Sequence, residues 1–547
     1  MKTSKISVKP VSFLQLKKMF KKRIFAIPEI QREFVWTKSK ILALLDSIKK
    51  HYPIGSFLIC RVPRNKVREV RENASIPKFD TKNKECYLVI DGQQRLSVLY
   101  SVLSGNKIVS KNNQREIDFT KIFLLKGAHE GPDFAFYINH WDDEPSLTKT
   151  LNNTLENNIK KSYKKHVKIC KKSFDNYEFP FIFINGYDEE NMREAFIRLN
   201  KGGTSLSAED KIFAEAYHKD SDLRRDCMQL THDLKKGFAN IDKKTIIKTI
   251  AALIYDLKKD FVSDQTQIAM AKELRKTRSF THKEYLTRKK KVFRSIQGAC
   301  DYLDARVRHA SYLPYDTMVT VLAVYFYYSN NRNPLPQHIE QINRWFWLTG
   351  FSRRYTGQDY RLNQINDAKE MRRLAENKTE KIKIEANPIS MRSIFNQRYD
   401  KAGALRNAYF CYLLSKRPMS FVNGEEVQVY EMSSLLNKKN DHHVFPKKRL
   451  AGYVKKDKIN CILNICFLTA QNNFQISAEL PWKYLKEYSR QKKFSQILKS
   501  QAMNIADLKV LLKAGNRVAK FNQFIELRKN LIKKDLIKLV GNKYVTE

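Results

Sequence analysis

Cysteine is sparse in this chain, and what there is forms no pattern. The eight cysteines are scattered over 547 residues without a Cys-x-x-Cys pair, at Cys60, Cys86, Cys170, Cys227, Cys300, Cys411, Cys461 and Cys466. A disulfide framework or a zinc ribbon would need cysteines at short, regular spacing. The sequence therefore argues against both, and we expect a protein of a reducing compartment, the bacterial cytoplasm.

Long hydrophobic runs are missing as well. The longest apolar run, residues 318–328, is shorter than the roughly 20 residues that cross a bilayer. Residues 1–10 contain no apolar segment of the kind found in secretion signals. We therefore expect a soluble protein that makes no membrane contact.

Two frequent catalytic and binding motifs are absent. No Gly-x-x-x-x-Gly-Lys-Ser/Thr loop occurs, so any nucleotide site would not be of the P-loop kind. No Gly-x-Ser-x-Gly elbow occurs, and no cysteine stands in a nucleophile motif, so covalent catalysis is not indicated.

Acidic residues are few relative to basic ones. The chain has 102 Lys and Arg against 57 Asp and Glu, a formal net charge of +45. Such an excess favours a polyanionic partner, because cations near phosphates release counterions. A lysine-rich genome composition explains part of it, but we expect nucleic acid rather than an acidic membrane.

Two adjacent histidines stand at the centre of the most informative stretch. His442 and His443 lie between β-prone residues and shortly before Pro446, and Asn464 and Asn473 follow. Imidazole nitrogen and carboxamide oxygen both suit a divalent ion that keeps positions open for water and phosphate. A histidine beside that ion suits a general base. A chance histidine pair, with the asparagines as caps or turn residues, is the alternative.

This set resembles the HNH, or ββα-metal, nuclease motif, in the branch found in GmrD-type restriction subunits. The resemblance implies that His442 is the first metal ligand and His443 the general base. It implies further that Asn464 braces the loop carrying the base and that Asn473 is the second metal ligand. The choice of Asn473 over Asn472 rests on this resemblance alone. The implied cofactor is Mg²⁺ or Mn²⁺.

A second motif lies in the N-terminal third. Residues 86–90 form an expected buried strand that runs into Asp91-Gly92-Gln93-Gln94-Arg95 and a helix at 96–103. A strand, a glycine turn and a helix start make an anion site, because the free N–H groups of the first turn point outward. An ordinary capped turn, whose glutamines satisfy backbone groups, is the alternative.

Four segments carry a second resemblance, at residues 27–36, 53–55, 91–96 and 196–207. They resemble the GmrS-type domain of modification-dependent restriction enzymes, a relative of the ParB/sulfiredoxin superfamily, over residues 10–220. The resemblance implies a bound nucleotide, ATP, GTP or CTP. The residues that it implies for this site are Gln31, Arg32, Asp91, Gly92, Gln93, Gln94 and Arg95.

The middle of the chain has helical periodicity to about residue 385. The basic run at 288–294 is either a solvated helix face or a track for a DNA backbone. The aromatic and arginine residues at 344–355 either stack on a base or form a helix core. Residues 378–388 are charged and are the expected linker, and a further short helix is expected at 11–25.

The predicted fold is α+β and multidomain. We expect a ParB/sulfiredoxin-like α/β domain at 1–220, a helical connecting domain at 221–385, and an HNH domain with helical flanks at 386–547. No internal repeat or low-complexity tract is present.

Together these features predict a GmrSD-like, type IV restriction endonuclease of anti-phage defence. It would cut modified foreign DNA, for example cytosine-modified DNA, under nucleotide control. Whether the N-terminal domain hydrolyses the nucleotide and whether the protein forms a homodimer stay open. Two alternatives are a nucleotide-switched, ParB-like DNA-binding protein and a nuclease effector of a larger defence complex that acts on unmodified DNA or RNA. The modification and the nucleotide are not encoded in a linear motif.

Overall fold

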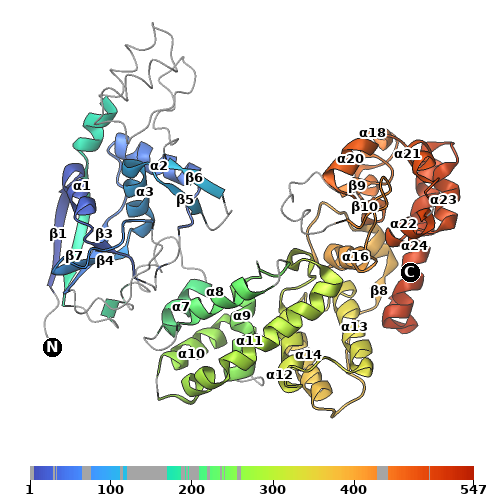
Figure 1. Cartoon of the computed structure of the whole chain (residues 1–547), viewed down its shortest axis with the longest axis horizontal. Helices are drawn as coiled ribbons and strands as arrows, with labels where there is room; N and C mark the ends of the chain where they lie inside the picture. The colour runs from blue at the N-terminus through green and yellow to red at the C-terminus, as the bar shows by residue number, and fades with distance from the viewer. Residues whose placement is uncertain are drawn as a thin grey trace, which may run out of the picture. The chain divides into compact units, whose positions relative to one another are not determined.

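A computed structural model describes the chain (Figure 1) over residues 5–28, 31, 34–63, 75–110, 115–119, 169–186, 191–192, 195, 208–217, 222–234, 237–239, 241–255, 260–276, 278–427, 441–491 and 493–547. The chain divides into two compact units, Met1–Ala214 and Glu215–Glu547. Over the described residues the chain is mixed α/β, mostly helical with one small main sheet.

The first unit is built on a five-stranded sheet. Its elements are β1 (Lys5–Ser12), α1 (Phe13–Lys21), β2 (Phe25–Ala26), α2 (Lys38–Lys49), β3 (Phe57–Pro63), β4 (Glu85–Asp91), α3 (Gln93–Ser104), β5 (Lys107–Ser110), β6 (Arg115–Asp118) and β7 (Glu178–Asn185), with α7 (Ala208–Ala216) at the boundary.

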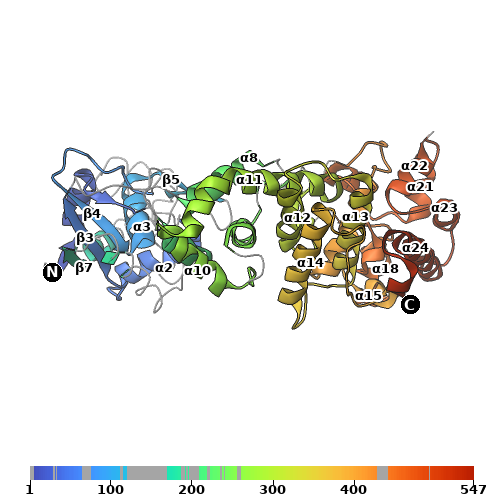
Figure 2. The same cartoon turned by 90° about the horizontal axis from the view of Figure 1, so that it is seen from below.

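The sheet order is β1-β7-β3-β4-β2, and β5 and β6 form a separate pair. Strand β3 lies at the centre, parallel to β7 and antiparallel to β4. Figure 1 and Figure 2 both show β3, β4 and β7 side by side. One core joins α1, α2 and α3 to these strands through fully buried side chains such as Leu16, Leu45 and Leu99.

The expected helix at 11–25 begins later and ends earlier than predicted. Residues 11 and 12 belong to β1, which pairs with β7 along all eight of its residues. The Ser12 side chain then caps α1 by accepting a hydrogen bond from the N–H of Gln15. In return the side-chain oxygen of Gln15 accepts a hydrogen bond from the N–H of Ser12. Strand pairing and a capping box together place the boundary, which helical periodicity alone missed.

The second unit begins with a helical part. Its elements are α8 (Leu223–Asp233), α9 (Lys243–Ile250), the π-helical turn η4 (Ala251–Tyr255), α10 (Asp264–Arg275), α11 (Phe280–Val307), η5 (Ala310–Tyr312), α12 (Thr317–Tyr328), α13 (Pro336–Phe351) and α14 (Tyr360–Ala375). Helix α12 packs against both α11 and α14. Eleven of its twelve residues are buried, which explains its uninterrupted apolar sequence.

The C-terminal part follows without a break in packing. It contains β8 (Ile389–Ser390), α15 (Met391–Asn396), α16 (Ala404–Ser415), β9 (Asp441–His443), α18 (Lys447–Leu450), α19 (Lys456–Ile459), η6 (Ile462–Asn464), β10 (Ile465–Phe467), α20 (Ala470–Ile476), α21 (Pro481–Tyr488), α22 (Phe494–Ser500), α23 (Ile505–Leu512), α24 (Arg517–Val540), η7 (Asn542–Tyr544) and β11 (Val545–Thr546). Helix α13 contacts both α16 and α24, and α11 contacts α16.

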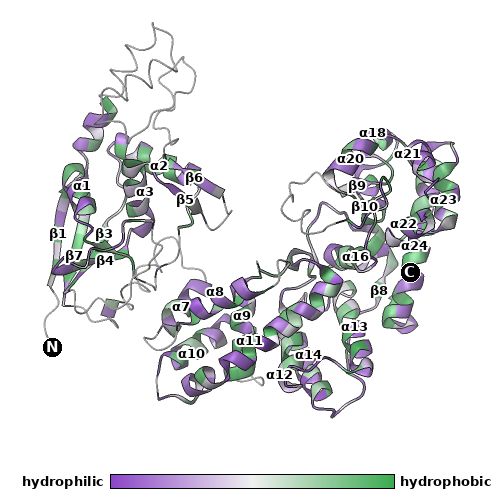
Figure 3. Cartoon of the chain, viewed as in Figure 1, coloured by the Kyte–Doolittle hydropathy of each residue, from purple (hydrophilic) through white to green (hydrophobic). Residues whose placement is uncertain are grey.

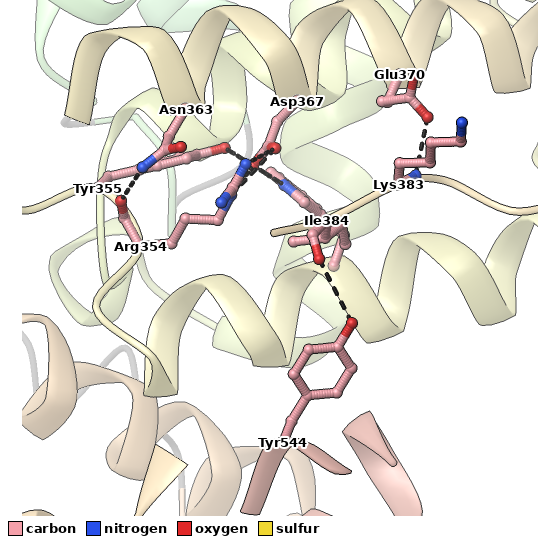
Figure 4. A network of polar contacts seen from close by, with 9 residues as sticks. Arg354, Tyr355, Asn363, Asp367, Glu370, Lys383, Ile384 and Tyr544 are labelled. Carbon is pink, nitrogen blue, oxygen red and sulfur yellow. Dashed lines mark hydrogen bonds and ion pairs between the residues drawn. The ribbon is translucent and has the colours of Figure 1, made fainter. Parts of the chain in front are cut away.

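Residues 378–388 are packed, although their charge predicted a linker. Ile382 and Ile384 are buried, and the backbone N–H of Lys383 donates to Glu370 of α14 over 2.8 Å. The hydroxyl of Tyr544 donates to the carbonyl of Ile384 over 3.4 Å (Figure 4). The charged residues face outward while two isoleucines hold the segment in place.

Most described helices carry hydrophobic and hydrophilic residues on the same helix (Figure 3), as expected for elements with one buried face. Among the described residues, no helix is both long and apolar enough to span a bilayer.

Candidate functional site

The two histidines lie on one strand of a short hairpin. Strands β9 and β10 are antiparallel, with His443 opposite Ile465 and His442 opposite Cys466. Helix α20 follows β10 after a short connection, which gives a strand-strand-helix order. Buried side chains on both strands, including Val444 and Phe467, fix the pair against the core of the second unit.

His442 and Asn473 are brought together by this arrangement. The Nδ1 atom of His442 lies 2.6 Å from the Oδ1 atom of Asn473, although the residues are 31 positions apart. The neighbouring Asn472 has a different task, because its backbone N–H and side chain bond to Thr469, the N-cap of α20. The structure thus places Asn473, and not Asn472, beside the histidine.

His442 is a neutral, buried imidazole. Burial lowers its pKa to about 4, the contact with Asn473 opposes this shift, and neighbouring His443 adds to it. Only 3% of the residue is exposed. At neutral pH the ring therefore keeps one unprotonated nitrogen that can bind a cation.

Neither tautomer of His442 satisfies the pair. If Nδ1 carries the proton, it donates to Asn473 and leaves a buried lone pair on Nε2, which has no hydrogen-bond partner among the described residues. If Nε2 carries the proton, that buried N–H has no partner among the described residues, while Nδ1 is free to accept from the Asn473 amide or to bind a cation.

A divalent cation fits this donor set. Adjacent ligands of an octahedral ion with bonds of about 2.1 Å lie about 3 Å apart, close to the observed separation. Within the described part of the chain, no group of three His, Cys, Asp or Glu side chains could hold a metal.

His443 points to a different partner from the same strand. Its Nε2 atom lies 3.2 Å from the Oδ1 atom of Asn460, and the ring of Tyr399 meets it edge to face, with centroids 5.1 Å apart. Burial lowers the pKa of His443, and the hydrogen bond to Asn460 opposes the shift. A half-buried, neutral imidazole of this kind can accept a proton.

Asn460 and its support were not predicted from the sequence. The Nδ2 atom of Asn460 donates to Asp400 over 3.3 Å, and hydrogen bonds from Arg398 hold the pKa of the Asp400 carboxyl below its ordinary value. Asp400 and His443 are far apart in sequence, and no local pattern connects them.

Asn464 braces the segment that follows the histidines. Its side chain accepts a hydrogen bond from the N–H of Phe445 over 2.9 Å and donates to the carbonyls of Phe445 and Ile459, each over 3.0 Å. Its own carbonyl accepts from the N–H of Val444 over 2.8 Å. Asn464 is fully buried, so these contacts fix the strand end directly after His443.

The N-terminal turn is also formed. Gly92 has φ +89° and begins α3, and a Cβ atom there would lie 2.7 Å from the Phe57 ring. Arg95 donates to the carbonyls of Ile54 and Ser56 over 2.6 and 3.0 Å, and to Asp91 over 3.2 Å. Burial lowers the pKa of Arg95, against the opposing effect of Asp91. The guanidinium thus connects the turn to the residues that directly precede β3.

Three glutamines predicted for the nucleotide site also bond within the first unit. Gln31 donates to the carbonyls of Val89 and Ile90 over 3.0 and 2.7 Å. Gln94 accepts from the N–H of Val35 over 2.9 Å and lies 3.5 Å from the carboxamide of Gln93. These contacts match the capped-turn alternative. Arg32 and the segment 196–207 lie outside the described residues.

The aromatic and arginine residues at 344–355 form a core. Trp345 is fully buried and donates to Asp367 over 3.0 Å. Arg354 and Tyr355 converge on the same carboxylate, over 2.9 and 2.7 Å at their shortest (Figure 4). The stacking alternative would need exposed rings.

The basic residues beside the histidines and those of the run at 288–294 are partly engaged in ion pairs. Arg449 of α18 pairs with Glu479 at 3.3 Å, and in the basic run Lys289 pairs with Asp226 at 3.1 Å. Lys290 and Arg294 are exposed. The run therefore contains both structural ion pairs and free-standing surface charge.

Two comparisons found similar proteins, and the family match supports the N-terminal resemblance. Residues 16–217 match the model of the GmrSD restriction endonuclease N-terminal domain. The uncharacterized protein MJ0686 of Methanocaldococcus jannaschii is 26% identical, over 94% of this chain and 96% of its own length. The family match contains the Gly92 turn and supports the predicted likeness to GmrSD restriction enzymes. The histidine hairpin lies outside that match.

Proposed function

We propose that this protein is a metal-dependent DNA endonuclease of the HNH type, in a GmrSD-like restriction system that acts against phage. The observation that carries the proposal is the hairpin that sets His442 against Asn473 and presents His443 beside them. The match of residues 16–217 to the GmrSD N-terminal domain supports the defence role, and the net charge of +45 suits a DNA substrate.

His442 and Asn473 would hold the cation, Mg²⁺ or Mn²⁺. When bound, such an ion supplies Lewis-acid stabilisation of the leaving 3′-oxygen. The two protein ligands come from a strand and a helix that share one core, so their separation is set before substrate arrives.

His443 would act as the general base. Its neutral ring would take a proton from a water that attacks phosphorus in line with the leaving oxygen. Asn464 would keep the strand end in place during this step, since its carboxamide bonds Phe445 on both backbone groups.

The first unit would bind ATP, GTP or CTP at the turn formed by Asp91 and Gly92 and sense the modification of DNA. The side chain of Asp91 is 43% exposed, whereas that of Arg95 is 15% exposed. Asp91 is therefore the residue to test: Asp91→Ala should weaken nucleotide binding at least tenfold at unchanged thermal stability. Equal nucleotide affinity in Asp91→Ala and wild type would remove this residue from the site.

The decisive experiment is cleavage of matched phage DNAs, unmodified and with modified cytosines, with Mg²⁺ or Mn²⁺ and with or without each nucleotide. We expect cutting of modified DNA, lost in EDTA. His443→Ala should lower the rate by at least about a hundredfold, while the exposed His232→Ala serves as the matched control and stays active.

Other outcomes are informative. Retained cleavage in His443→Ala would remove that residue as the base. Nucleotide-dependent DNA binding without any cutting would favour the ParB-like switch. An inactive chain that gains activity with a partner protein would favour an effector of a larger complex.

A further inference from the structure

A chain of side-chain hydrogen bonds runs behind His443. Asn460 lies against Nε2 of the ring at 3.2 Å and donates to Asp400 over 3.3 Å. The guanidinium of Arg398 donates two hydrogen bonds to the Asp400 carboxylate, over 2.8 and 2.5 Å. Its remaining nitrogen donates to Asp457 over 2.5 Å. Asn460 is only 2% exposed, while Asp457 lies at the surface.

Backbone hydrogen bonds join the two segments that carry these side chains, residues 397–400 and 460–462. The N–H of Tyr399 donates to the carbonyl of Asn460 over 3.0 Å, and the N–H of Ile462 donates to the carbonyl of Gln397 over 2.9 Å. Arg398 and Cys461 form an isolated antiparallel bridge. The support is therefore a two-segment platform and not a single flexible side chain.

The chemistry of these groups fixes their orientation. An aspartate gripped by an arginine is ionised and can only accept hydrogen bonds, so the amide nitrogen of Asn460 must face Asp400. The carboxamide oxygen then faces His443 and requires a proton on Nε2. The lone pair of the neutral ring is consequently on Nδ1.

We propose that Asn460, held by Asp400 and Arg398, is a positioning residue that fixes the tautomer and orientation of His443, with Nδ1 presented to the attacking water. This inference rests on the proposed nuclease function for its kinetic consequence, but its structural content is independent of cleavage. The side-chain contacts of Asn460 join it to His443 and Asp400, so it acts on the reaction through His443.

The kinetic test uses Asn460→Ala with Asn423→Ala, an exposed asparagine of the same unit, as the matched control. We expect kcat of Asn460→Ala to fall by roughly 10- to 100-fold, the range seen for outer-shell partners. KM for DNA and the Mn²⁺ affinity measured by calorimetry should stay within about twofold of wild type. Tm should stay within a few degrees of wild type. A parallel loss of kcat, Mn²⁺ affinity and Tm would reduce Asn460 to a structural residue and overturn the proposal.

A second substitution tests the direction of the bonds. In Asn460→Asp two carboxylates would face each other, and kcat should fall further than in Asn460→Ala. An equal or smaller loss of kcat in Asn460→Asp would contradict the orientation.

A spectroscopic measurement decides the matter without cleavage. Nitrogen-15 labelling of histidine reports the tautomer of His443, assigned by its loss in His443→Ala. Wild type should show the Nε2–H form, and Asn460→Ala a mixture of both forms. If wild type shows the Nε2–H form and Asn460→Ala the mixture, but wild type cuts no DNA, the nuclease function is refuted and the inference stands. An Nδ1–H tautomer in wild type would refute the inference itself.

Discussion

A single carboxamide determines how firmly the candidate catalytic strand is held. Asn464 is fully buried, and its side chain makes three hydrogen bonds, two to Phe445 and one to Ile459. A side chain that both accepts and donates is needed, because it bonds an N–H and a carbonyl of the same residue. The position of His443 therefore depends on an asparagine at this site.

Replacing Asn464 with Ala should destabilise the second unit. The change leaves buried backbone groups without partners, each worth about 1–3 kcal/mol, so we expect a loss of roughly 2 kcal/mol or more in the free energy of unfolding. Thermal unfolding monitored by tryptophan fluorescence measures it. Gln475→Ala, an exposed position on α20, is the control and should change little. Unchanged stability in Asn464→Ala would mean that water or a shifted loop replaces the bonds.

At the scale of elements, α24 ties the C-terminal part together through one buried cation. Arg528 is 0% exposed and donates to the carbonyls of Leu463, Ile465 and Gln501 over 2.7, 2.8 and 2.7 Å. The first two carbonyls flank Asn464 in the chain. A long C-terminal helix thus supports the hairpin through three hydrogen bonds from one guanidinium.

Substitutions at Arg528 should rank by how many of these bonds survive. Lysine has a compact ammonium that cannot match the planar fork, and methionine keeps only the stem. We expect Tm to fall in Arg528→Lys and further in Arg528→Met, as measured by calorimetry. Lys534→Met, at an exposed position of the same helix, is the control. Equal Tm in Arg528→Met and wild type would show that the three carbonyls find other partners.

The turn before α3 is an element whose backbone admits only glycine. Gly92 combines φ +89° with a Phe57 ring 2.7 Å from the place of a Cβ atom, whereas Gly357 has φ +83° with nothing within 4 Å. The left-handed conformation costs about 1 kcal/mol for alanine at either site. Only Gly92 adds a collision.

Gly92→Ala should therefore destabilise its unit more than Gly357→Ala destabilises the other. We expect a cost of about 1 kcal/mol for Gly357→Ala and at least twice that for Gly92→Ala. Chemical denaturation, with each unit followed by protection of its own amides from hydrogen exchange, separates the two. Similar costs would mean that the Phe57 ring moves aside freely.

At the scale of the whole molecule, charge dominates. The formal net charge of +45 over 547 residues already counts every acidic residue, so ion pairs such as Lys289 with Asp226 leave this excess unchanged. Cations that neutralise phosphates release condensed counterions, so affinity for DNA depends on salt.

We expect the His443→Ala variant, which leaves DNA intact, to lose roughly a thousandfold or more in DNA affinity between about 50 and 200 mM salt. Fluorescence anisotropy at several salt concentrations gives the slope. Modified and unmodified DNA should share that slope and differ in intercept, because the recognition of a modified base releases no counterion. A slope near zero would argue against nucleic acid as the partner.

Features that depend on neighbouring residues could be predicted from the sequence alone. Local patterning predicted the strand β4, the glycine turn at Gly92 and the order of His442, His443, Asn464 and Asn473. It also supplied the likeness of the N-terminal part to GmrSD enzymes, which the family match supports. Charge and apolar periodicity are properties of short windows, so they can be read without a fold.

Which polar groups meet could be seen only in the folded structure. His443 reaches Asn460 across 17 positions, Asn460 reaches Asp400 across 60, and Arg528 reaches Leu463 across 65. It also placed Trp345 in a core and bonded Arg95 to the carbonyls of a distant loop. Hydrogen bonds form wherever folding brings a donor to an acceptor, and no periodic pattern in the sequence records that encounter.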